Sequence, residues 1–462
     1  MVGADPAAEA EVVVVGGGNA AVCAALAARE AGARVLLLER DPQATRGGNS
    51  KYTRNVRCAD PVNYPPDELL DDLIKVTGDA IDLEMARFAV EQSLQAPSWM
   101  ERQGVVWQPA LRGTQGLSRT NRFFLGGGKA LLNTYYRRAA DVGVEVRYGR
   151  HVTRVATARG QPVTLRVEGE DGARTVHARA VVVASGGFES NLEWLRKYRG
   201  DAVDNYVVRG TASNDGDVLS QLFQLGARRK GNPEGFHAVA VDARSPRYDG
   251  GIVTRIDSVP LGVVVNREAR RFADEGQDIW PRRYATWGRL VGEQPGQTAF
   301  SIFDRRAWGR FIPGCYPPVT ANSIPELARG LGLDPDRLDG TLREYNRHAA
   351  GGEVYDTSAA DGRTTSELKP AKSNWALAID QPPFRAYPLR CGITFTYLGV
   401  GVDRCARVLD EGDRPFPGLF AAGEVMAGNI LLEGYLAGFG MTIGTVFGRI
   451  AGREAADHAR AA

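Results

Sequence analysis

The order of apolar and polar positions near the start of the chain predicts a βαβ unit. Residues 11–15 are mostly valine and are followed by three glycines, the pattern of a strand buried on both faces. Residues 20–31 are rich in alanine, carry Leu26 on a helical period and end at Gly32, a typical C-terminal stop. Residues 34–38 are a second apolar strand. Two strands around one helix imply a parallel sheet covered by helices.

A different pattern follows in the middle of the chain. Residues 144–184 alternate apolar and polar positions and predict a small meander that leads into an apolar strand. The strands that we predict there are residues 144–148, 152–157, 163–168, 175–178 and 180–184.

The βαβ rhythm is then interrupted. Residues 236–376 are richer in Trp, Arg and Pro and contain two helical stretches, 324–331 and 338–348. A strand-to-turn signal returns at 420–423, and a glycine-rich helix is predicted over 434–452. The predicted fold is α/β: a Rossmann-like parallel sheet domain with a small β-meander and an inserted α+β capping domain. The first domain is predicted in two parts, residues 1–235 and 377–462, around a capping domain at residues 236–376.

The turn after the first strand has the sequence of a dinucleotide-binding loop. Residues 16–21, GGGNAA, fit the GxGxxA pattern between a strand and a helix. Gly16 permits the tight turn, Gly18 lets backbone N–H groups approach a pyrophosphate, and Ala21 keeps helix and strand close. The helix N-terminus adds partial positive charge. The position of these residues predicts a bound dinucleotide.

Two acidic residues refine the choice of dinucleotide. Glu39 ends the second strand, where it can accept hydrogen bonds from an adenosine ribose and disfavour a 2′-phosphate. NAD would satisfy this first unit equally well. Residues 418–424 read as a strand that delivers Glu424 to a polyol chain. FAD has a ribityl chain and NAD does not, so we predict FAD.

Composition excludes several classes of function. Lysine and arginine (57) almost balance aspartate and glutamate (55), so no overall field draws the chain to nucleic acid. Apolar runs are far shorter than the roughly 20 residues of a bilayer helix, and residues 1–11 read as a short tail without an export signal. We predict a cytoplasmic protein with no membrane span, metal site or nucleic-acid partner. Its cysteines lack CxxC spacing and read as reduced thiols: Cys23, Cys58, Cys315, Cys391 and Cys405.

Several separated motifs, in this order, resemble the fumarate reductase and succinate dehydrogenase flavoprotein superfamily. Besides the first glycine motif they are Gly47-Gly48-Asn49-Ser50, Ala184-Ser185-Gly186-Gly187, Asn214-Asp215-Gly216-Asp217, Val265-Asn266-Arg267 through Arg271-Phe272, and Ala422-Gly423-Glu424. The resemblance runs over nearly the whole chain and implies an FAD-binding domain with an inserted capping domain.

Within this superfamily the chain is most similar to FAD-dependent tricarballylate dehydrogenases. The motifs are Arg46-Gly47-Gly48-Asn49-Ser50 with Thr53-Arg54-Asn55, Leu117-Ser118-Arg119-Thr120-Asn121, Phe124-Leu125-Gly126-Gly127-Gly128-Lys129, Gly251-Ile252-Val253-Thr254-Arg255, Trp280-Pro281-Arg282-Arg283-Tyr284 and Gly392-Ile393-Thr394-Phe395-Thr396-Tyr397. This likeness implies oxidation of tricarballylate to cis-aconitate, with electrons leaving through a separate partner.

Three departures limit what the resemblance implies. Succinate dehydrogenases attach FAD through a histidine after the GGNS-like loop, where this chain has residues 50–53, SKYT, so we expect noncovalent FAD. The histidine and arginine of the fumarate-type clamp fall at about Thr394 and Ile430, which disfavours fumarate and succinate. Leu432 and Glu433 stand where a glycine and a lysine are expected, and a carboxylate there would repel a substrate carboxylate, which leaves the exact substrate open.

The resemblance also assigns the cofactor contacts. A helix that starts near Gly434 is expected to point its N-terminus at the flavin N1 and C2 carbonyl, where negative charge develops on reduction. The expected contacts are Gly16, Gly18, Asn19, Ala20, Glu39, Arg40, Gly47, Gly48, Asn49, Ser50, Gly127, Gly128, Val152, Ala184, Ser185, Gly186, Asn214, Asp215, Gly423, Glu424, Gly434, Tyr435 and Leu436.

Desaturation of an acid requires an electron sink and fixed cations. Side chains do not accept hydride, so the flavin N5 takes it, and the protein orients the acid. Arginine suits this role because its planar fork binds carboxylates bidentately and stays charged. The arginines that the resemblance places near the flavin or the cleft are Arg54, Arg57, Arg119, Arg122 and Arg255. The other expected substrate contacts are Thr394, Tyr397 and Glu433.

A second group must take the proton. Arg283 best matches the arginine acid of the superfamily, but arginine is a poor base unless a carboxylate relay helps it. Glu275 and Asp278 are the candidates for that relay. Tyr284 is the alternative, because a phenol with a pKa near about 10 is easier to activate by nearby cations. His237 resembles a histidine of the superfamily's cleft and either contacts substrate or is structural.

Other reactions fit the same motifs. A desaturase would pass its electrons to a separate protein or to oxygen. A flavin-dependent enoate reductase would need electrons from elsewhere, because the chain has no haem CxxCH or iron–sulfur cysteine set. A non-redox flavoprotein that isomerises or dehydrates its substrate is a third alternative, and it would turn over without any acceptor.

Overall fold

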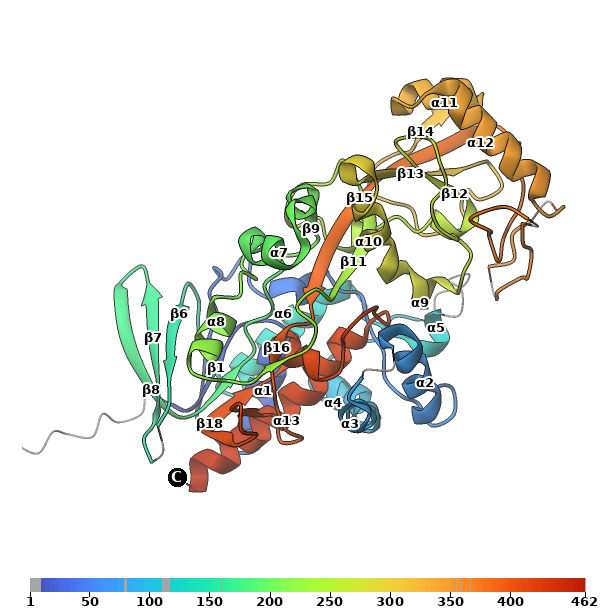
Figure 1. The fold of residues 1–462 in the computed structure, drawn as a ribbon. Helices are drawn as coiled ribbons and strands as arrows, with labels where there is room; N and C mark the ends of the chain where they lie inside the picture. Colours follow the sequence, from blue (N-terminus) through green and yellow to red (C-terminus); the bar gives the residue numbers. More distant parts are fainter. Residues whose placement is uncertain are drawn as a thin grey trace, which may run out of the picture.

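A computed structural model of the chain describes residues 10–78, 81–109, 117–158, 160–352, 354–357, 359–365 and 367–461. Most of the predicted N-terminal tail, residues 1–9, lies outside the described residues. Two sheets form the frame of the molecule, and the long strand β15 (Phe384–Thr396) runs from one part to the other (Figure 1).

The first sheet has eight strands in the order β17-β18-β8-β1-β2-β5, with β7 also paired to β8 and β6 paired to β7. β1 pairs with β2 and with β8 in parallel, and Val12 lies opposite both Val35 and Ala180. In the predicted strand 11–15, Glu11 is partly buried and the four valines are buried, as expected for a sheet covered on both faces. The predicted α/β fold with a parallel sheet is confirmed. The strands are β1 (Ala10–Val15), β2 (Val35–Leu38), β5 (Glu145–Arg147), β6 (His151–Ala156), β7 (Val163–Gly169), β8 (Gly172–Val183), β17 (Arg407–Leu409) and β18 (Pro415–Ala421).

The predicted meander differs from the observed one in two respects. Its first strand, β5, instead pairs with β2 at the edge of the parallel sheet. The last two predicted strands are one strand, β8, which pairs with β7 in its first part and with β1 in its second. The charged residue Arg179 does not break β8, because its guanidinium reaches the carbonyl of Ala459 at 3.0 Å.

Two helices cross the first sheet in close contact. α1 (Asn19–Glu30) packs against α13 (Phe439–Ala461), and glycines of α13 face the backbone of α1. The predicted start of this helix at Gly434 is wrong, because Gly434 and Gly438 have φ values of 52° and 85° and leave the helical region before Phe439. The predicted end at Gly452 is also wrong, since that glycine permits contact with Ala24 rather than ending the helix.

The second sheet has six strands and crosses both predicted domain boundaries. Its order is β11-β15-β13-β12, with β14 and β9 also paired to β15. The predicted helices at 324–331 and 338–348 are present as α11 and α12, capped by the side chains of Ser323 and Asp334. The other strands of this sheet are β9 (Val207–Val208), β11 (Phe236–Asp242), β12 (Val263–Asn266), β13 (Thr298–Phe303) and β14 (Val319–Ala321).

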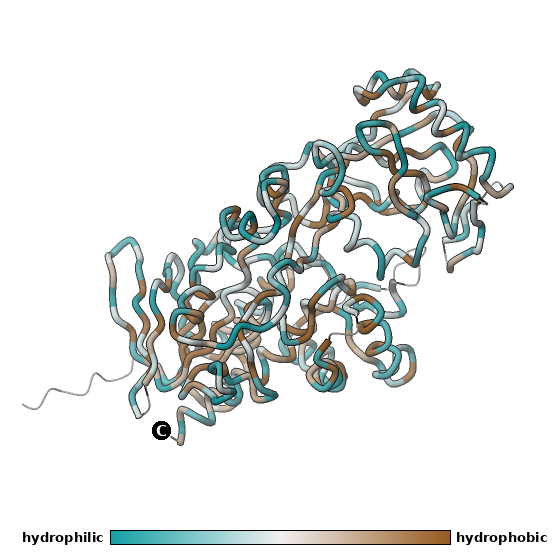
Figure 2. Tube along the Cα trace, in the orientation of Figure 1, coloured by the Kyte–Doolittle hydropathy of each residue, from teal (hydrophilic) through white to brown (hydrophobic). Residues whose placement is uncertain are grey.

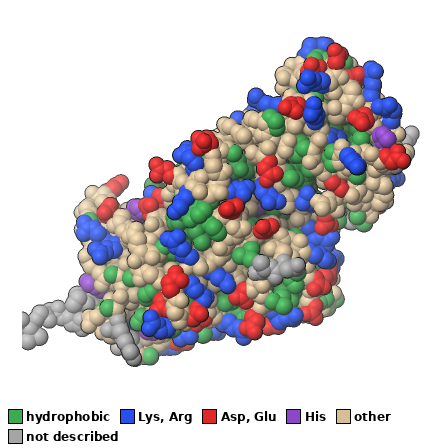
Figure 3. All heavy atoms as spheres, in the orientation of Figure 1, with side chains coloured by type: hydrophobic (Ala, Val, Ile, Leu, Met, Phe, Trp, Pro, Cys, Tyr) green, Lys and Arg blue, Asp and Glu red, His purple; other side chains and the backbone are tan. Residues whose placement is uncertain are grey.

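Shorter elements complete the described chain. Figure 2 shows apolar positions concentrated along the strands and helices of the interior, and Figure 3 shows basic and acidic side chains interspersed over one face. No helix among the described residues is long and apolar enough to span a membrane.

The remaining helices are α2 (Pro66–Thr77), α3 (Leu83–Ser93), α4 (Ala96–Arg102), α5 (Leu117–Thr120), α6 (Gly127–Asp141), α7 (Leu192–Arg199), α8 (Asp217–Gln224), α9 (Trp280–Arg283), α10 (Trp287–Gly292), α11 (Ile324–Leu331) and α12 (Pro335–His348). Two small ribbons pair β3 (Asn55–Val56) with β4 (Arg122–Phe123) and β10 (Arg229–Lys230) with β16 (Gly399–Val400).

The contact between α1 and α13 predicts a sharp sensitivity to one methyl group. A Cβ at Gly448 would lie 2.5 Å from the carbonyl oxygen of Ala20, whereas a Cβ at Gly340, in α12, would meet nothing within 4 Å. Gly448→Ala should lower the free energy of unfolding by about 1–3 kcal/mol. Gly340→Ala should leave it unchanged or raise it by up to about 1 kcal/mol. Thermal unfolding of both variants tests this, and equal melting temperatures would contradict it.

Candidate active site

A large cavity opens along the carboxyl ends of the parallel strands β1, β2, β8 and β18, the edge where α/β sheets bind ligands. The space between its walls, including the part open to solvent, is about 1530 Å³. Its walls are the residues that follow each strand together with side chains from the second sheet. The sequence-predicted cofactor residues that line it are Gly16, Gly18, Asn19, Ala20, Glu39, Arg40, Gly48, Asn49, Ser50, Val152, Ala184, Ser185, Gly186, Asn214, Asp215, Gly423, Glu424 and Tyr435.

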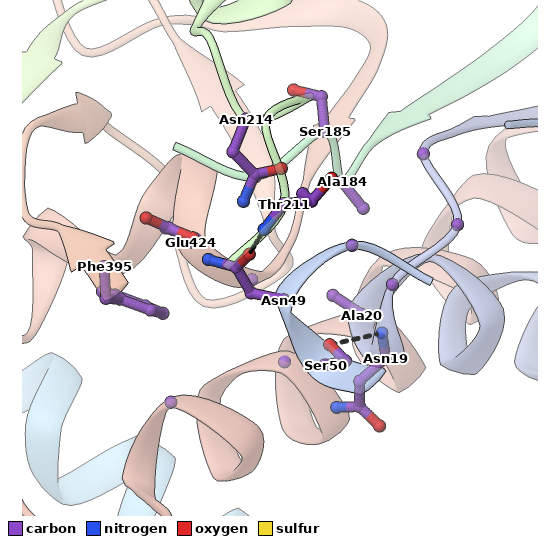
Figure 4. Close-up of a pocket in the computed structure, with 18 of the residues that line it drawn as sticks. Asn19, Ala20, Asn49, Ser50, Ala184, Ser185, Thr211, Asn214, Phe395 and Glu424 are labelled. Carbon is purple, nitrogen blue, oxygen red and sulfur yellow. Dashed lines mark hydrogen bonds between the residues drawn. The ribbon is translucent and has the colours of Figure 1, made fainter. Parts of the chain in front are cut away.

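The glycine loop at the start of α1 is packed too tightly for side chains. Gly16 has φ of 116°, and a Cβ there would lie 2.3 Å from the carbonyl oxygen of Ala184. The hydroxyl of Ser50 accepts the backbone N–H of Asn19 at 3.0 Å, so the 47–50 loop covers the helix N-terminus (Figure 4). The Asn19 side chain instead donates to Thr445 on α13. The backbone of this loop, rather than its side chains, is available to a pyrophosphate.

Glu39 is placed as an adenosine-ribose ligand requires. Its side chain is buried and accepts the N–H groups of Asp41 and Gly47, at 2.9 and 3.3 Å. Burial raises the pKa of this carboxyl above its usual value. A Cβ at Gly17 would lie 1.7 Å from a carboxyl oxygen of Glu39, so only glycine fits beside it. Arg40 is fixed by an ion pair with Asp215 at 2.5 Å.

The other expected glycine contacts support the cavity from behind. Gly128 is the second residue of α6, and a Cβ on it would lie 2.1 Å from the Ser50 carbonyl oxygen. Gly47 packs against Leu132. Gly434 lies against Val76 and Leu436 is fully buried, so neither is part of the cavity wall. The remaining predicted contact, Gly127, is also absent from the wall and packs near the Thr53 carbonyl oxygen.

A polar cluster lies where the 47–50 loop meets the ends of β8 and β18. The side-chain amide of Asn49 donates to Glu189 at 2.5 Å and to the carbonyl of Thr394 at 2.7 Å. Glu424 accepts the N–H of Thr396 at 2.8 Å. Figure 4 shows Asn49, Asn214 and Glu424 around one point of the cavity. We did not predict Glu189 from the sequence, although its place in Ser185-Gly186-Gly187-Phe188-Glu189, after an apolar strand, was the available signal.

Three arginines line the part of the cavity beyond Thr394: Arg54, Arg209 and Arg255. Arg255 forms a bidentate pair with Asp257, at 2.6 and 2.7 Å, and Arg54 approaches the same carboxylate at 4.0 Å. Burial lowers the pKa values of Arg54 and Arg209 to about 10, and the charge of Arg255 adds to both effects. All three therefore stay protonated at neutral pH.

Asp257 is the counter-ion of this arginine cluster. Burial opposes its ionisation, but Arg255, Arg54 and the indole N–H of Trp280 outweigh burial and lower its pKa. Burial also opposes the charge of Arg255, but Asp257 outweighs it and raises that pKa. Three positive charges and one negative charge leave the cluster with two uncompensated positive charges.

Arg209 is held by an irregularity in the second sheet. In the pairing of β11 with β15, His237 faces Phe395 and Ala238 faces Ile393, so Thr394 is the extra residue of a β-bulge. Such bulges re-aim side chains beside active sites. The hydroxyl of Thr394 accepts the Nε–H of Arg209 at 2.8 Å. We missed Arg209 in the sequence because nothing local to residues 207–211 indicates this distant partner.

Aromatic side chains form the wall beside the arginines. His237 stacks on Tyr435, with ring centroids 3.9 Å apart, and meets Tyr284 edge-on at 5.5 Å. The guanidinium of Arg255 lies 4.8 Å from the centre of the Tyr284 ring. Burial, with Arg209 and Arg255, lowers the pKa of His237 well below its usual range, so the ring is neutral. Burial raises the pKa of Tyr284, and nearby arginines oppose that rise.

The structure does not bring the other predicted substrate residues to this wall. Arg57 is buried against Tyr64 and the Ala437 carbonyl. Arg119 and Arg122 form exposed ion pairs with Glu68 and Asp60, because their side chains point away from the cavity. The hydroxyl of Tyr397 donates to the Gly434 carbonyl, and Glu433 is exposed.

The predicted arginine relay is not formed either. Arg283 is absent from the cavity wall, and its buried Nε has no hydrogen-bond partner among the described residues. Glu275 pairs with Arg271 at 2.6 Å, and Asp278 pairs with Arg282 at 2.6 Å. The neighbouring Tyr284 lines the cavity, because the chain turns at the end of α9.

Comparisons with known proteins agree with this geometry. A family model described as an FAD binding domain matches residues 11–438. A probable fumarate reductase (Ifc3) of Shewanella frigidimarina is 29% identical over 99% of this chain and 76% of its own length. A urocanate reductase of Eggerthella lenta is 26% identical over 97% of this chain and 75% of its own length. The open conformation of a flavocytochrome c3 fumarate reductase superposes with a TM-score of 0.77 at 26% identity, over 99% of this chain and 79% of that one.

The match extends over most of the chain and includes every strand end that forms the cavity. The glycine loop, buried Glu39 and the polar cluster at Glu424 suit the phosphate, ribose and polyol groups of FAD. The chain belongs to the FAD binding domain family of the fumarate reductase and succinate dehydrogenase flavoprotein superfamily, and it is an FAD-dependent oxidoreductase.

Proposed function

We propose that the protein transfers a hydride between FAD and a carbon–carbon bond of a small di- or tricarboxylic acid. One observation carries the proposal: Arg54, Arg209 and Arg255 line the FAD cavity together, and one carboxylate, Asp257, pairs with Arg54 and Arg255. Buried charges that lack counter-ions are costly, and two substrate carboxylates would balance them. A neutral or singly charged substrate would leave positive charge unpaired.

Unused donors of the arginines favour the same conclusion. The Nε and Nη2 atoms of Arg54 are buried and have no hydrogen-bond partner among the described residues. Arg209 is fixed through Nε by Thr394, which leaves its terminal nitrogens for a ligand. Arginine binds carboxylates through paired N–H groups, and a preformed set of them holds an acid in one orientation.

Among such acids we infer tricarballylate, converted to cis-aconitate. The motifs around Arg54, Arg255 and Tyr284 support this choice through their resemblance to tricarballylate dehydrogenases. The repulsion expected from Glu433 does not argue against it, since that side chain is exposed and outside the cavity wall. We expect the protein to be cytoplasmic and to bind FAD noncovalently. We also expect it to pass electrons to a separate protein or to oxygen.

Bound FAD supplies the electron sink for this reaction, because its N5 accepts a hydride. Desaturation also releases a proton from the adjacent carbon. Tyr284 is the residue that we propose takes it, with Arg255 beside its ring to stabilise the phenolate. His237 is the second candidate: its Nε2 is buried without a protein partner among the described residues, and the neutral ring can accept a proton. Arg283 does not line the cavity, and the two carboxylates of its expected relay, Glu275 and Asp278, pair with other arginines.

The names of the relatives favour the reverse direction as a second candidate. Several are named reductases, of fumarate, urocanate and vinyl phenol, whereas two others are named dehydrogenases of cyclic oxo acids. The same arginines would bind an unsaturated acid, and Tyr284 would then donate the proton instead of taking it. This reaction needs an external electron donor.

A spectral experiment tests the function. The FAD-loaded protein, kept anaerobic, should lose its oxidised-flavin absorbance when tricarballylate is added, and should respond weakly to monocarboxylates. Bleaching by another di- or tricarboxylate would correct the substrate but keep the class. A flavin reduced by a donor and reoxidised by an unsaturated acid alone would support the reductase. Turnover of an acid with no acceptor and no spectral change would contradict both.

Removal of the Tyr284 hydroxyl should slow the chemistry selectively. Tyr284→Phe should reduce the rate of flavin reduction about 10²–10⁴-fold with little effect on substrate affinity. Burial raises the pKa of Tyr284 above its usual 10.0, so the wild-type rate of desaturation should increase with pH throughout the neutral range, and the variant should lose this dependence. Stopped-flow absorbance measures both. Arg283→Met is the matched control, and a larger loss in that variant would restore the arginine mechanism.

We expect the negative charge of Asp257 to stabilise the folded protein by pairing with Arg54 and Arg255. Asp257→Asn leaves Arg54 and Arg255 buried without their carboxylate, which should lower the free energy of unfolding by about 3 kcal/mol at pH 7. The folded-state pKa of Asp257 is lowered, so this stability is present above the unfolded pKa near 3.8 and is lost as pH falls. Substrate affinity should increase in the folded variant. Glu68→Gln, at the exposed Arg119 pair, should change melting little. Equal melting of both variants would contradict the role of Asp257.

A further inference from the structure

Two carboxyl groups meet at the polyol end of the cavity. Glu189 follows the glycine turn after β8, and Glu424 lies in the 3₁₀ helix η7 (Gly423–Asn429) that follows β18. β8 and β18 are adjacent parallel strands, so their carboxyl ends bring the two side chains together. Glu189 is fully buried, Glu424 lines the cavity, and the two carboxyl groups lie close enough for each to change the pKa of the other.

Hydrogen bonds from neighbouring residues occupy one oxygen of each carboxyl. Oε1 of Glu189 accepts the amides of Asn49 and Asn214, at 2.5 and 2.6 Å. Oε1 of Glu424 accepts the N–H and the hydroxyl of Thr396, at 2.8 and 3.2 Å. Oε2 of Glu189 is buried and has no donor among the described residues. A proton on the Glu424 carboxyl would supply the donor that Oε2 of Glu189 lacks.

The surroundings of the pair supply no strong compensation for two negative charges. Burial raises the pKa of Glu189 to about 7, and the amides of Asn49 and Asn214 only reduce this rise. Burial and the adjacent Glu189 hold the pKa of Glu424 well above its usual value. Like charges in contact in a buried site do not both ionise near neutral pH.

We propose that Glu189 is a positioning residue that keeps Glu424 protonated, so that the two side chains share one proton and present a neutral carboxyl group to FAD. A neutral carboxyl both donates and accepts hydrogen bonds, which suits the hydroxyl groups of a ribityl chain. It also keeps a second negative charge away from a cofactor that already carries a pyrophosphate. This inference rests on the FAD cofactor and is independent of the substrate.

The variant Glu189→Gln separates the shared proton from the shape of the site. Its carbonyl can accept the amides of Asn49 and Asn214, and its NH₂ can donate to Glu424, whose pKa then loses the increase that the negative charge of Glu189 causes. In the wild type, stability from the pair is full below the unfolded pKa of 4.5 and is lost as pH rises through about 7. The melting temperature of Glu189→Gln should lack that loss. Glu193→Gln, an exposed neighbour on α7, should behave as the wild type.

Infrared and cofactor titrations test the proton directly. At neutral pH the wild type should show the C=O stretch of a protonated carboxyl, which both Glu189→Gln and Glu424→Gln should remove. The dissociation constant for FAD should rise about tenfold in the wild type between about pH 6 and about pH 8, and should stay level in Glu189→Gln. If the variants do not fold, loss of the wild-type band on raising the pH is the remaining test. Absence of that band at neutral pH, its survival in both variants, or equal pH profiles would overturn the proposal.

Discussion

The pairing of β11 with β15 is the constraint on which the rest of the site depends. It joins the second sheet to the strand ends of the first. Its bulge at Thr394 brings this one residue into contact with both the 47–50 loop and Arg209. The carbonyl of Thr394 accepts Asn49 from the 47–50 loop, while its hydroxyl orients Arg209. His237 enters from the opposite strand of the same pair. A regular ladder would turn the Thr394 side chain to the other face and separate these contacts.

Charge is distributed unevenly along the cavity that this junction closes. The arginine cluster has more positive charge than its single carboxylate balances, whereas Glu189 and Glu424 form no ion pair with a cation among the described residues. Both arrangements are costly in a folded protein without ligands. The ligands that we propose would relieve the cost: a multiply charged acid at the arginines and, at the two carboxyls, a proton together with the hydroxyl groups of the cofactor. We therefore expect the free energy of unfolding of the protein to depend on which ligands occupy the site.

Local patterns predicted the features that are local in sequence. The strand, the glycine turn and Glu39 lie within one βαβ unit, and their spacing alone indicated a dinucleotide. Arg54, Arg255 and Tyr284 were expected at the substrate site and do line the cavity. The features that sequence could not supply are set by contacts between distant segments. Arg209 depends on a bulge almost two hundred residues away, and Glu189 depends on the neighbouring strand end. Arg119 has the right side chain, but its backbone directs it to Glu68 at the surface.

Binding of the acid by uncompensated arginines is the central claim, and Arg209 tests it most directly. The dissociation constant of tricarballylate, from the perturbation of the flavin spectrum, should be compared in the wild type, Arg209→Gln and the surface control Arg119→Gln. Loss of one buried charge pair costs about 2–5 kcal/mol, so Arg209→Gln should weaken binding at least about thirtyfold while FAD stays bound. Arg119→Gln should bind as the wild type does. Unchanged affinity in Arg209→Gln, or an equal loss in both variants, would contradict the account.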